Sequence, residues 1–473
     1  MQKSRLFRKF ISLIVVLAIL CSTVFSLSSC FSSFRKEEDR DGILENISET
    51  VKNDRKNYDN VTPYLSDWGL PKFDTQKLSW VEGIFQQFYN IKGGRPDTLD
   101  HAVLTANHFL DNYYGKIDHS DKETVTDAII TSYVEVIGDP YSVYRTPDEN
   151  EEYGQDISGT FGGIGVTVEY DHQNKTIMVV AVHIGSPSEA AGMKVGDYIV
   201  GVNGKTVEEV GYDKMVNHIR GKVGTPVTVT VLRGDKKLDL TMTREIVTDQ
   251  TVTYSLDEDG IGYIRVTEFK EITHKQFTEA VDFMLENDAK GIVFDVRSNP
   301  GGLLETVVDM MSYILPTGKT VLSYQYKGQP TVKRLTEKDK TDKNGKAVDV
   351  VVDLPMVVLC NEYSASAAEI FTSVIRDYRN EGLLNATIVG TTTYKKGIMQ
   401  ASFQYTKDSS LITLTVAYYN PPSGENYHGT GITPDVYVEL PDTPSDDGTI
   451  EDTQLAKGIE ELKKLINANN ILQ

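Results

Sequence analysis

The chain has 473 residues, of which 40% are hydrophobic and 25% are charged, so about two or three globular domains are expected. Acidic residues outnumber basic ones by 68 to 48, giving a formal charge of -20. This balance argues against a nucleic-acid partner, because binding phosphates requires clustered lysine and arginine. The three cysteines form no disulfide framework, and no histidine or cysteine cluster has metal-ligand spacing, so we expect no metal and no other cofactor.

Residues 1–30 have the pattern of a targeting signal. Basic residues within the first nine positions precede an apolar run from Phe10 to Leu27. The basic flank stays cytoplasmic, so we expect the rest of the chain to lie outside the cytoplasm at the cell membrane. The run ends in Leu27-Ser28-Ser29-Cys30, which resembles a bacterial lipobox. Lipidation of Cys30 and an uncleaved signal anchor remain equal alternatives.

Residues 31–157 are predicted to form a polar stalk followed by a helical region. The stalk is charge-rich and requires no packed core. From Thr75, apolar residues recur at intervals of three and four, which is typical of amphipathic helices. Three such segments precede Gly138-Asp139-Pro140-Tyr141, a turn signal.

Residues 158–245 are predicted to form a separate domain of short strands and two helices. The order of these elements, with a glycine pair before the first strand, resembles a PDZ domain. PDZ domains bind a chain end by strand addition and hold its carboxylate on the N–H groups of a glycine-rich turn. The resemblance implies that this turn contains Gly162, Gly163, Ile164 and Gly165.

Residues 246–440 alternate strands with helices, which indicates an α/β core with a mostly parallel sheet. Residues 441–473 are predicted to contain a final amphipathic helix. Cys360 closes the apolar run that starts at Leu354 and is expected to be a small buried hydrophobe rather than a catalytic thiol.

The segment from Asn361 to Ile370 follows a buried strand and opens a helix. A serine at such a turn presents its hydroxyl beside unpaired helical N–H groups, which can stabilise an anion. An acyl-transfer nucleophile needs this arrangement. Taken alone, the segment favours the simpler interpretation that Ser364 and Ser366 cap the helix.

A nucleophilic serine also needs a base, and no histidine lies in a supporting motif. A desolvated lysine with a lowered pKa can take the hydroxyl proton. The segment from Gly390 to Gln400 offers Lys395 and Lys396, although by itself it resembles a solvated loop.

The choice between catalytic and purely structural interpretations of these two segments depends on several motifs that occur in order along the chain. They are Asp295–Gly302, Ser364–Glu369, Lys396-Gly397 with Gln400, and Gly431–Asp435. Together they resemble the carboxy-terminal processing (tail-specific) proteases over roughly residues 100–440. The resemblance implies a multidomain α/β protein: a crotonase-like or ClpP-like protease core with an inserted PDZ-like β domain and an N-terminal helical region.

The resemblance also implies roles for individual residues. Ser366 matches the nucleophile, Lys396 the base, and Gln400 the glutamine that orients the lysine. The backbone N–H groups of Ala367 and Gly302 match the oxyanion donors.

The chain departs from the family pattern at three positions. The family usually has Ser at Ala368, Phe at Tyr394 and Gly at Lys395. Lys395 matters most, because a second charge beside Lys396 would lower the pKa of the base or compete for its role.

These observations lead to the hypothesis of a membrane-tethered, extracytoplasmic serine endopeptidase that recognises substrate C-termini and cleaves envelope or secreted proteins. Met215 and Ile219 would line the peptide groove, so an apolar final residue is expected. Arg220 is a candidate for coupling the PDZ domain to the active site, and the favoured alternative is an ordinary surface arginine. The sequence leaves the oligomeric state open. The alternative is a catalytically silent PDZ scaffold, which would not need Ser366 or Lys396.

Overall fold

The computed structural model describes residues 72–90, 98–171, 176–337, 352–441 and 451–472. The expected targeting signal, Cys30 and most of the expected stalk lie outside these ranges. Within them, no helix has the length and hydropathy needed to cross a membrane.

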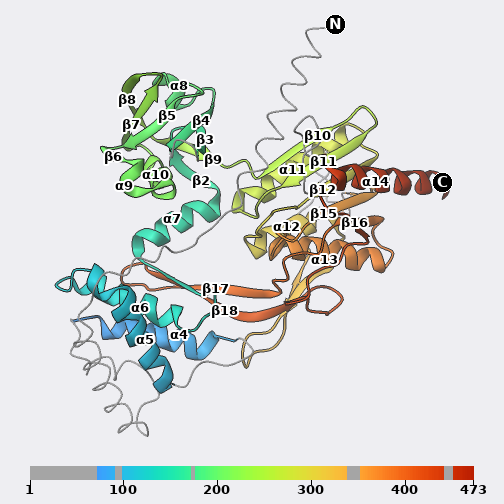
Figure 1. The fold of residues 1–473 in the computed structure, drawn as a ribbon. Helices are drawn as coiled ribbons and strands as arrows, with labels where there is room; N and C mark the ends of the chain where they lie inside the picture. The colour runs from blue at the N-terminus through green and yellow to red at the C-terminus, as the bar shows by residue number, and fades with distance from the viewer. Residues whose placement is uncertain (1–71, 91–97, 172–175, 338–351, 442–450, 473) are drawn as a thin grey trace.

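The three helices expected before the PDZ-like domain are present as α4 (Thr75–Phe88), α5 (Thr98–Asn112) and α6 (Lys122–Glu135). They pack against a long hairpin made of β17 (Ile398–Gln404) and β18 (Leu411–Asn420) (Figure 1). Apolar residues of β18 belong to the same hydrophobic core as the helices. The remaining strands of this sheet are β1 (Val143–Arg145), β13 (Thr320–Tyr324) and β14 (Val332–Leu335).

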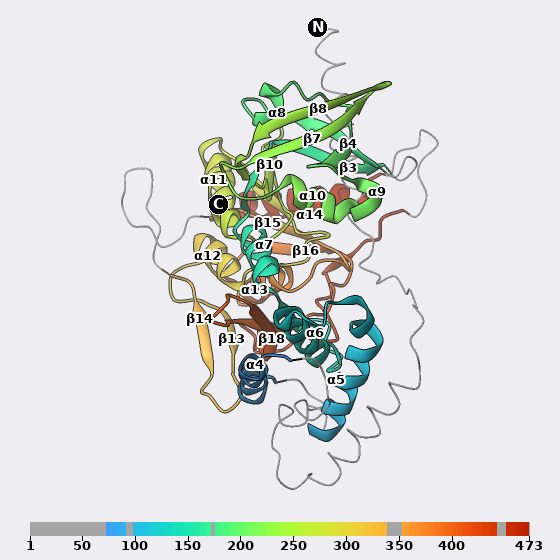
Figure 2. The same ribbon diagram turned by 90° about the vertical axis from the view of Figure 1, so that its left-hand side faces the viewer.

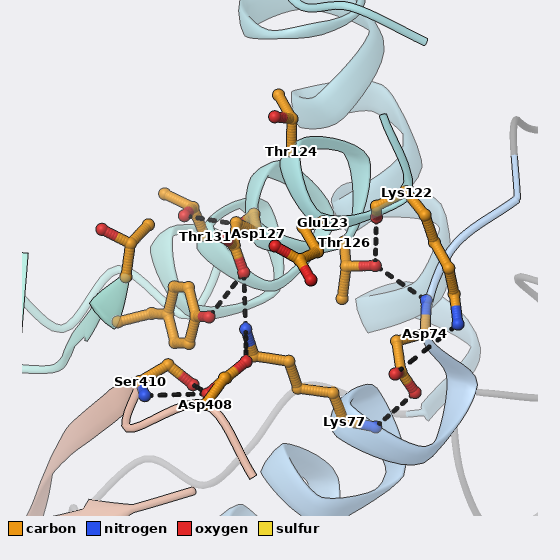
Figure 3. A network of polar contacts seen from close by, with 12 residues as sticks. Asp74, Lys77, Lys122, Glu123, Thr124, Thr126, Asp127, Thr131, Asp408 and Ser410 are labelled. Carbon is orange, nitrogen blue, oxygen red and sulfur yellow. Dashed lines mark hydrogen bonds and ion pairs between the residues drawn. The ribbon is translucent and has the colours of Figure 1, made fainter. Parts of the chain in front are cut away.

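A buried lysine holds the helices onto the hairpin (Figure 3). Lys77 Nζ of α4 lies 2.7 Å from Asp127 of α6 and 2.8 Å from Asp408 in the hairpin turn. The Tyr144 hydroxyl of β1 donates to the same Asp127 oxygen at 2.6 Å. Burial opposes the charge on Lys77, but the hydrogen bonds to both carboxylates outweigh it and raise the pKa of Lys77. Removing this lysine would leave two facing carboxylates unpaired.

Helix α7 (Pro147–Ser158) leads from the helical region to the PDZ-like domain (Figure 2). The domain has one sheet in the order β3-β4-β5-β7-β8, with β6 paired to β5. Its strands are β3 (Val166–Asp171), β4 (Thr176–Val182), β5 (Tyr198–Val202), β6 (Lys205–Thr206), β7 (Pro226–Arg233) and β8 (Lys236–Thr243). Its helices are α8 (Pro187–Ala190), α9 (Val207–Val210) and α10 (Tyr212–Ile219). Strands β2 (Thr160–Gly163) and β9 (Glu245–Thr248) pair where the chain enters and leaves the domain.

The α/β core is built on a sheet in the order β10-β11-β12-β15-β16-β19. All neighbouring pairs are parallel except β10 with β11. The strands are β10 (Val252–Leu256), β11 (Ile261–Val266), β12 (Gly291–Asp295), β15 (Met356–Cys360), β16 (Ala386–Gly390) and β19 (Val436–Tyr437). The mostly parallel sheet expected from the sequence is therefore confirmed.

Helices cover both faces of this sheet, so its central strands are buried on both sides. One face packs against α11 (Glu271–Glu286), α12 (Leu304–Ile314) and α13 (Ala367–Asn380). The other packs against α14 (Thr453–Leu472), through Leu462 and its neighbours. Cys360 is fully buried, and burial raises the pKa of its thiol, so it is a core residue as expected.

Candidate active site

Ser366 lies at the turn between β15 and α13, as the pattern of strand and helix predicts. Its backbone has φ 53° and ψ -112°, which residues other than glycine seldom adopt. The turn is tight because Gly301 packs against it. A Cβ on Gly301 would lie 2.7 Å from Ser366 Cβ and 2.8 Å from the Ala365 carbonyl oxygen. The nucleophile candidate and the Asn299–Gly302 loop are therefore in direct contact.

Two backbone N–H groups beside Ser366 are free to bind an anion. Within the part of the chain that the structure describes, neither Gly302 N nor Ala367 N donates a hydrogen bond. Gly301 N, by contrast, donates to Asn299 Oδ1 at 2.8 Å. Ser366, Gly302 and Ala367 line one pocket of about 390 Å³. The N–H groups of Gly302 and Ala367 are therefore candidates for binding the negative charge that develops on a substrate carbonyl oxygen when a nucleophile attacks it.

The Asn299–Gly302 loop is anchored by a buried ion pair at the end of β12. Arg297 donates from its backbone N, Nε and Nη2 to the Asp295 carboxylate at 2.6–3.0 Å. Its guanidinium also binds Asp452, just before α14, at 2.7 and 2.8 Å. Burial alone would raise the pKa of Asp295, but the Arg297 charge lowers it overall. The Asp-Val-Arg motif thus supports the loop and makes no contribution to the pocket lining.

Lys396 lines the same pocket and lies two residues before β17 begins at Ile398. Burial lowers its pKa, against the opposing charges of Asp139 and Glu369. Among the described residues, no carboxylate lies within 4.0 Å of Lys396 Nζ. Its Nζ instead lies 4.3 Å from the centre of the Tyr141 ring. A lysine in such surroundings loses its proton more readily than one in water.

Glu369, which is not among the site residues predicted from the sequence, connects Ser366 to Lys396. Its Oε2 accepts from the N–H groups of Ser366 at 3.0 Å and Lys396 at 2.8 Å. Its Oε1 accepts from Thr393 Oγ1 at 2.6 Å and Lys395 N at 2.7 Å. The side chain is fully buried, and burial raises its pKa against these hydrogen bonds. A glutamate three residues after a helix N-cap could have indicated a capping role, but not the bond to Lys396.

Gln400 lines the pocket with Lys396, yet no hydrogen bond joins the two among the residues described. Its amide nitrogen donates to Thr415 Oγ1 at 3.1 Å. Its orienting role stays a prediction.

Lys395 does not enter the pocket lined by Lys396. Its side chain is exposed and lines a separate hollow with Thr392 and Tyr437. Its backbone has φ 84°, in the left-handed region that favours glycine. This conformation explains why glycine suits the position. Because the Lys395 side chain lies outside the pocket that Ser366 lines, it is not placed to compete with Lys396 as the base.

The PDZ residues named in the sequence analysis lie at the start of the domain, and all four are buried. Gly162 and Gly163 belong to β2, and the Gly162 carbonyl accepts from Gly221 N at 2.9 Å. The turn into β3 therefore comprises Ile164 and Gly165. Gly165 has φ 73°, and a Cβ there would lie 2.4 Å from Ser186 Cβ. Strand β3, which follows, is at the end of its sheet, so one of its edges is unpaired within the described residues.

The expectation for the PDZ helix needs correction. Met215 is fully buried and Ile219 is 5% exposed, and both belong to the PDZ core instead of lining an open groove. The half-buried residues of α10 that the structure describes are Tyr212, Val216 and His218, and the Tyr212 ring contacts Tyr170 of β3. Arg220 lies over the Phe161 ring at 4.1 Å, beside the turn.

The fold and the pocket define a serine-type peptidase with an attached PDZ domain. Among the described residues, no group of three or more His, Cys, Asp and Glu side chains could hold a metal ion. Comparison with known proteins agrees: residues 260–438 match the model of peptidase family S41, and residues 162–243 match that of the PDZ domain.

Full-length relatives place the chain more narrowly. It is 35% identical over 333 residues to the carboxy-terminal processing protease CtpA of Bacillus subtilis (strain 168), covering 70% of this chain and 67% of that one. It is 36% identical over 373 residues to a probable CtpA-like serine protease of Staphylococcus aureus (strain COL), covering 79% and 67%. The chain belongs to peptidase family S41 and is a carboxy-terminal processing serine protease with a PDZ domain. This membership favours the protease hypothesis over the alternative of a catalytically silent scaffold.

Solved structures also align with the chain. The photosystem II D1 C-terminal processing protease is 23% identical with a TM-score of 0.42, covering 77% of this chain and 93% of that chain. A putative S41 protease from Bacteroides fragilis NCTC 9343 is 16% identical with a TM-score of 0.45, covering 83% and 97%.

Proposed function

We propose that this protease cleaves proteins with a catalytic dyad of Ser366 and Lys396. The observation that supports the dyad most directly is the shared pocket. Both side chains line it together with Gly302 and Ala367, whose N–H groups have no acceptor among the described residues. The lowered pKa of Lys396, which burial causes, favours the neutral amine that a base requires.

The proposed reaction is an acyl transfer. Neutral Lys396 takes the Ser366 hydroxyl proton while Oγ attacks the scissile carbonyl carbon. The N–H groups of Gly302 and Ala367 stabilise the negative charge that develops on the carbonyl oxygen. Protonated Lys396 then gives its proton to the leaving amine, and neutral Lys396 activates the water that hydrolyses the acyl-enzyme. Gln400 is proposed to orient the lysine.

We propose that the PDZ domain selects substrates by their C-termini. An extended peptide would add to the unpaired edge of β3, with its carboxylate at the Ile164-Gly165 turn. Tyr212 and Val216 of α10 would contact the last side chain, so an apolar final residue is expected. The arrangement would hold a protein by its end while a nearby bond enters the pocket.

We further propose that the protease is tethered at the outer side of the cell membrane and acts on envelope or secreted proteins. The proposal rests on the basic start, the apolar run and Cys30 in the sequence. Radioactive palmitate fed to cells that express the full chain would label the parent but not Cys30→Ser if Cys30 is lipidated. An unlabelled parent that remains in the membrane fraction would instead establish a signal anchor, and a parent in the soluble fraction would contradict tethering.

The dyad is tested with the full chain in detergent and a fluorogenic peptide library. Ser366→Ala and Lys396→Met are expected to lose cleavage by at least about a thousandfold, as removal of catalytic groups does in other serine peptidases. Lys395→Met is the matched control, because its side chain lies outside the pocket. Cleavage that survives Lys396→Met but not Lys395→Met would contradict the assignment of the base.

C-terminal recognition has a separate test. The same peptides are offered with a free or an amidated C-terminus, and the ratio of kcat/KM values is measured. Recognition of the carboxylate predicts a marked loss on amidation. Equal cleavage of both forms would refute the C-terminal proposal and leave the dyad intact.

A further inference from the structure

The helical region reaches the active site through the loop between α6 and β1. Asp139 fixes this loop: its carboxylate accepts from Tyr141 N at 3.0 Å and from Ser142 Oγ at 2.5 Å. Ser142 Oγ in turn accepts from Thr415 N of β18 at 3.2 Å. Thr415 is also the residue that holds the Gln400 amide. The loop is therefore fastened to the same hairpin that begins just after Lys396.

The loop places an aromatic ring on the candidate base. The Tyr141 ring centre is 4.3 Å from Lys396 Nζ, and both side chains are half-buried and line the Ser366 pocket. At this distance a ring attracts an ammonium group and also occupies space that water would otherwise fill. Burial and the neighbouring Tyr394 raise the pKa of Tyr141 to about 12, so its hydroxyl stays neutral around pH 7.

We infer that Tyr141 is a positioning residue for proteolysis: its ring holds the Lys396 amine in place and shields it from water. The helical region, to which neither the resemblance nor the chemistry assigned a role, thereby completes the active site. This inference rests on the proposed dyad of Ser366 and Lys396. The Lys77 clamp, which fastens α4 and α6 to the hairpin, keeps the loop in register with the base (Figure 3).

Other titratable groups also face Lys396. Asp139 from the loop and Glu369 from α13 favour its charged form. His428 accepts from Gly397 N, and burial lowers its pKa, so it is neutral around pH 7. Tyr419 donates from its hydroxyl to the Lys396 carbonyl oxygen at 2.6 Å. Further charged residues that line the pocket come from β1, α7 and the segment before α11: Arg145, Asp156, Glu268 and Lys270.

Removing the Tyr141 ring has two opposite effects on the base. Loss of the ring's attraction for an ammonium group lowers the pKa of Lys396 by roughly 0.4 to 1.5 pH units. Entry of water raises it, and full burial is worth up to about 3–5 pH units. The Tyr141 ring lies directly over the amine, so we expect entry of water to outweigh the lost attraction and the pKa of Lys396 to rise. Activity requires the neutral amine, so the acid limb of the pH profile moves to higher pH.

The experiment measures kcat and KM of the full chain against pH with a fluorogenic peptide. For Tyr141→Ala we expect the acid limb of kcat/KM to move up by about one pH unit, with a roughly tenfold lower kcat at pH 7 and KM within about twofold. Tyr141→Phe keeps the ring and is expected to retain the parent profile. Tyr141→Leu keeps an apolar cover without the aromatic face, so its acid limb stays in place or moves to lower pH.

Tyr153→Ala is the matched control. The Tyr153 ring lies 3.9 Å from the Arg145 guanidinium and lines the same pocket, but it does not cover the lysine. Its removal is expected to leave the acid limb in place. The inference is overturned if folded Tyr141→Ala keeps the parent limb, if Tyr153→Ala moves it equally, or if Tyr141→Leu moves it upward. Retention of activity by Lys396→Met would instead refute the dyad itself.

Discussion

Glu369→Gln tests whether one buried carboxylate sets the geometry between Ser366 and Lys396. The substitution keeps the size of the side chain and removes its charge. Glu369 receives four donors, two on each oxygen, so it must be ionised to accept all of them. A glutamine has one acceptor oxygen, and its NH₂ group would face two donors.

The magnitude follows from the bonds that are lost. Whichever way the amide is oriented, two charge-assisted hydrogen bonds disappear, each worth about 1.5–3 kcal/mol. The total is about 3–6 kcal/mol, divided between folding and the transition state. If the NH₂ group replaces Oε2, the N–H groups of Ser366 and Lys396 lose their acceptor; if it replaces Oε1, the N–H of Lys395 and the Thr393 hydroxyl lose theirs. In either orientation part of the loss falls on the alignment of Ser366 with Lys396. A share of about 3 kcal/mol in the transition state lowers kcat roughly a hundredfold.

The assay combines peptide cleavage with thermal unfolding. We expect Glu369→Gln to lower kcat about a hundredfold, with KM little changed and the melting temperature reduced by a few degrees. Glu362→Gln is the matched control, because Glu362 is exposed and accepts only from Thr391 Oγ1 among the described residues. A Glu369→Gln variant with kcat within about threefold of the parent would refute the reasoning.

Three further substitutions test other contacts. Lys77→Met removes the cation that pairs with Asp408 and should lower the free energy of unfolding, measured by urea titration, by about 3 kcal/mol. Adding Asp408→Asn should recover part of this loss. An unchanged free energy of unfolding would contradict the role of Lys77 in holding the helices to the hairpin. Lys395→Gly relieves the strain of a positive φ and should stabilise the fold by up to about 1 kcal/mol. It should leave kcat unchanged, and a tenfold loss of kcat would indicate that the Lys395 side chain takes part in catalysis. Gly302→Ala should be nearly inactive, because its Cβ would lie 2.3 Å from the Phe269 carbonyl oxygen; full activity would exclude Gly302 from the oxyanion site.

The sequence predicted those parts of the site that depend on local order. A strand followed by a tight turn and a helix is enough to place Ser366 and Ala367 together. The order of the family motifs predicted that Gly302, Lys396 and Gln400 belong to the same site. In the structure all three line one pocket with Ser366. Alternating strands and helices likewise predicted the parallel core, because each element carries its own periodicity.

The sequence could not predict contacts that depend on packing between distant segments. Tyr141 lies more than 200 positions before Lys396, and no periodicity links a loop tyrosine to a lysine in another element. The apolar residues of α10 form one stripe, and the sequence alone does not tell which part of the stripe faces the core, so Met215 and Ile219 were assigned to the groove although they belong to the core. The positive φ of Lys395 was hidden because lysine carries no signal for it.

The proposed nucleophile and the proposed base are held by different sheets, and this arrangement determines what must be held in place. Ser366 and the N–H groups of Gly302 and Ala367 all belong to the parallel core. Lys396 lies two residues before the first strand of the hairpin, which packs against the helical region. Sliding of the hairpin against the core would therefore leave the oxyanion site complete and remove only the base. Glu369 opposes this movement because its carboxylate binds the backbone on both sides, and the helical region opposes it by fastening the hairpin from the far end.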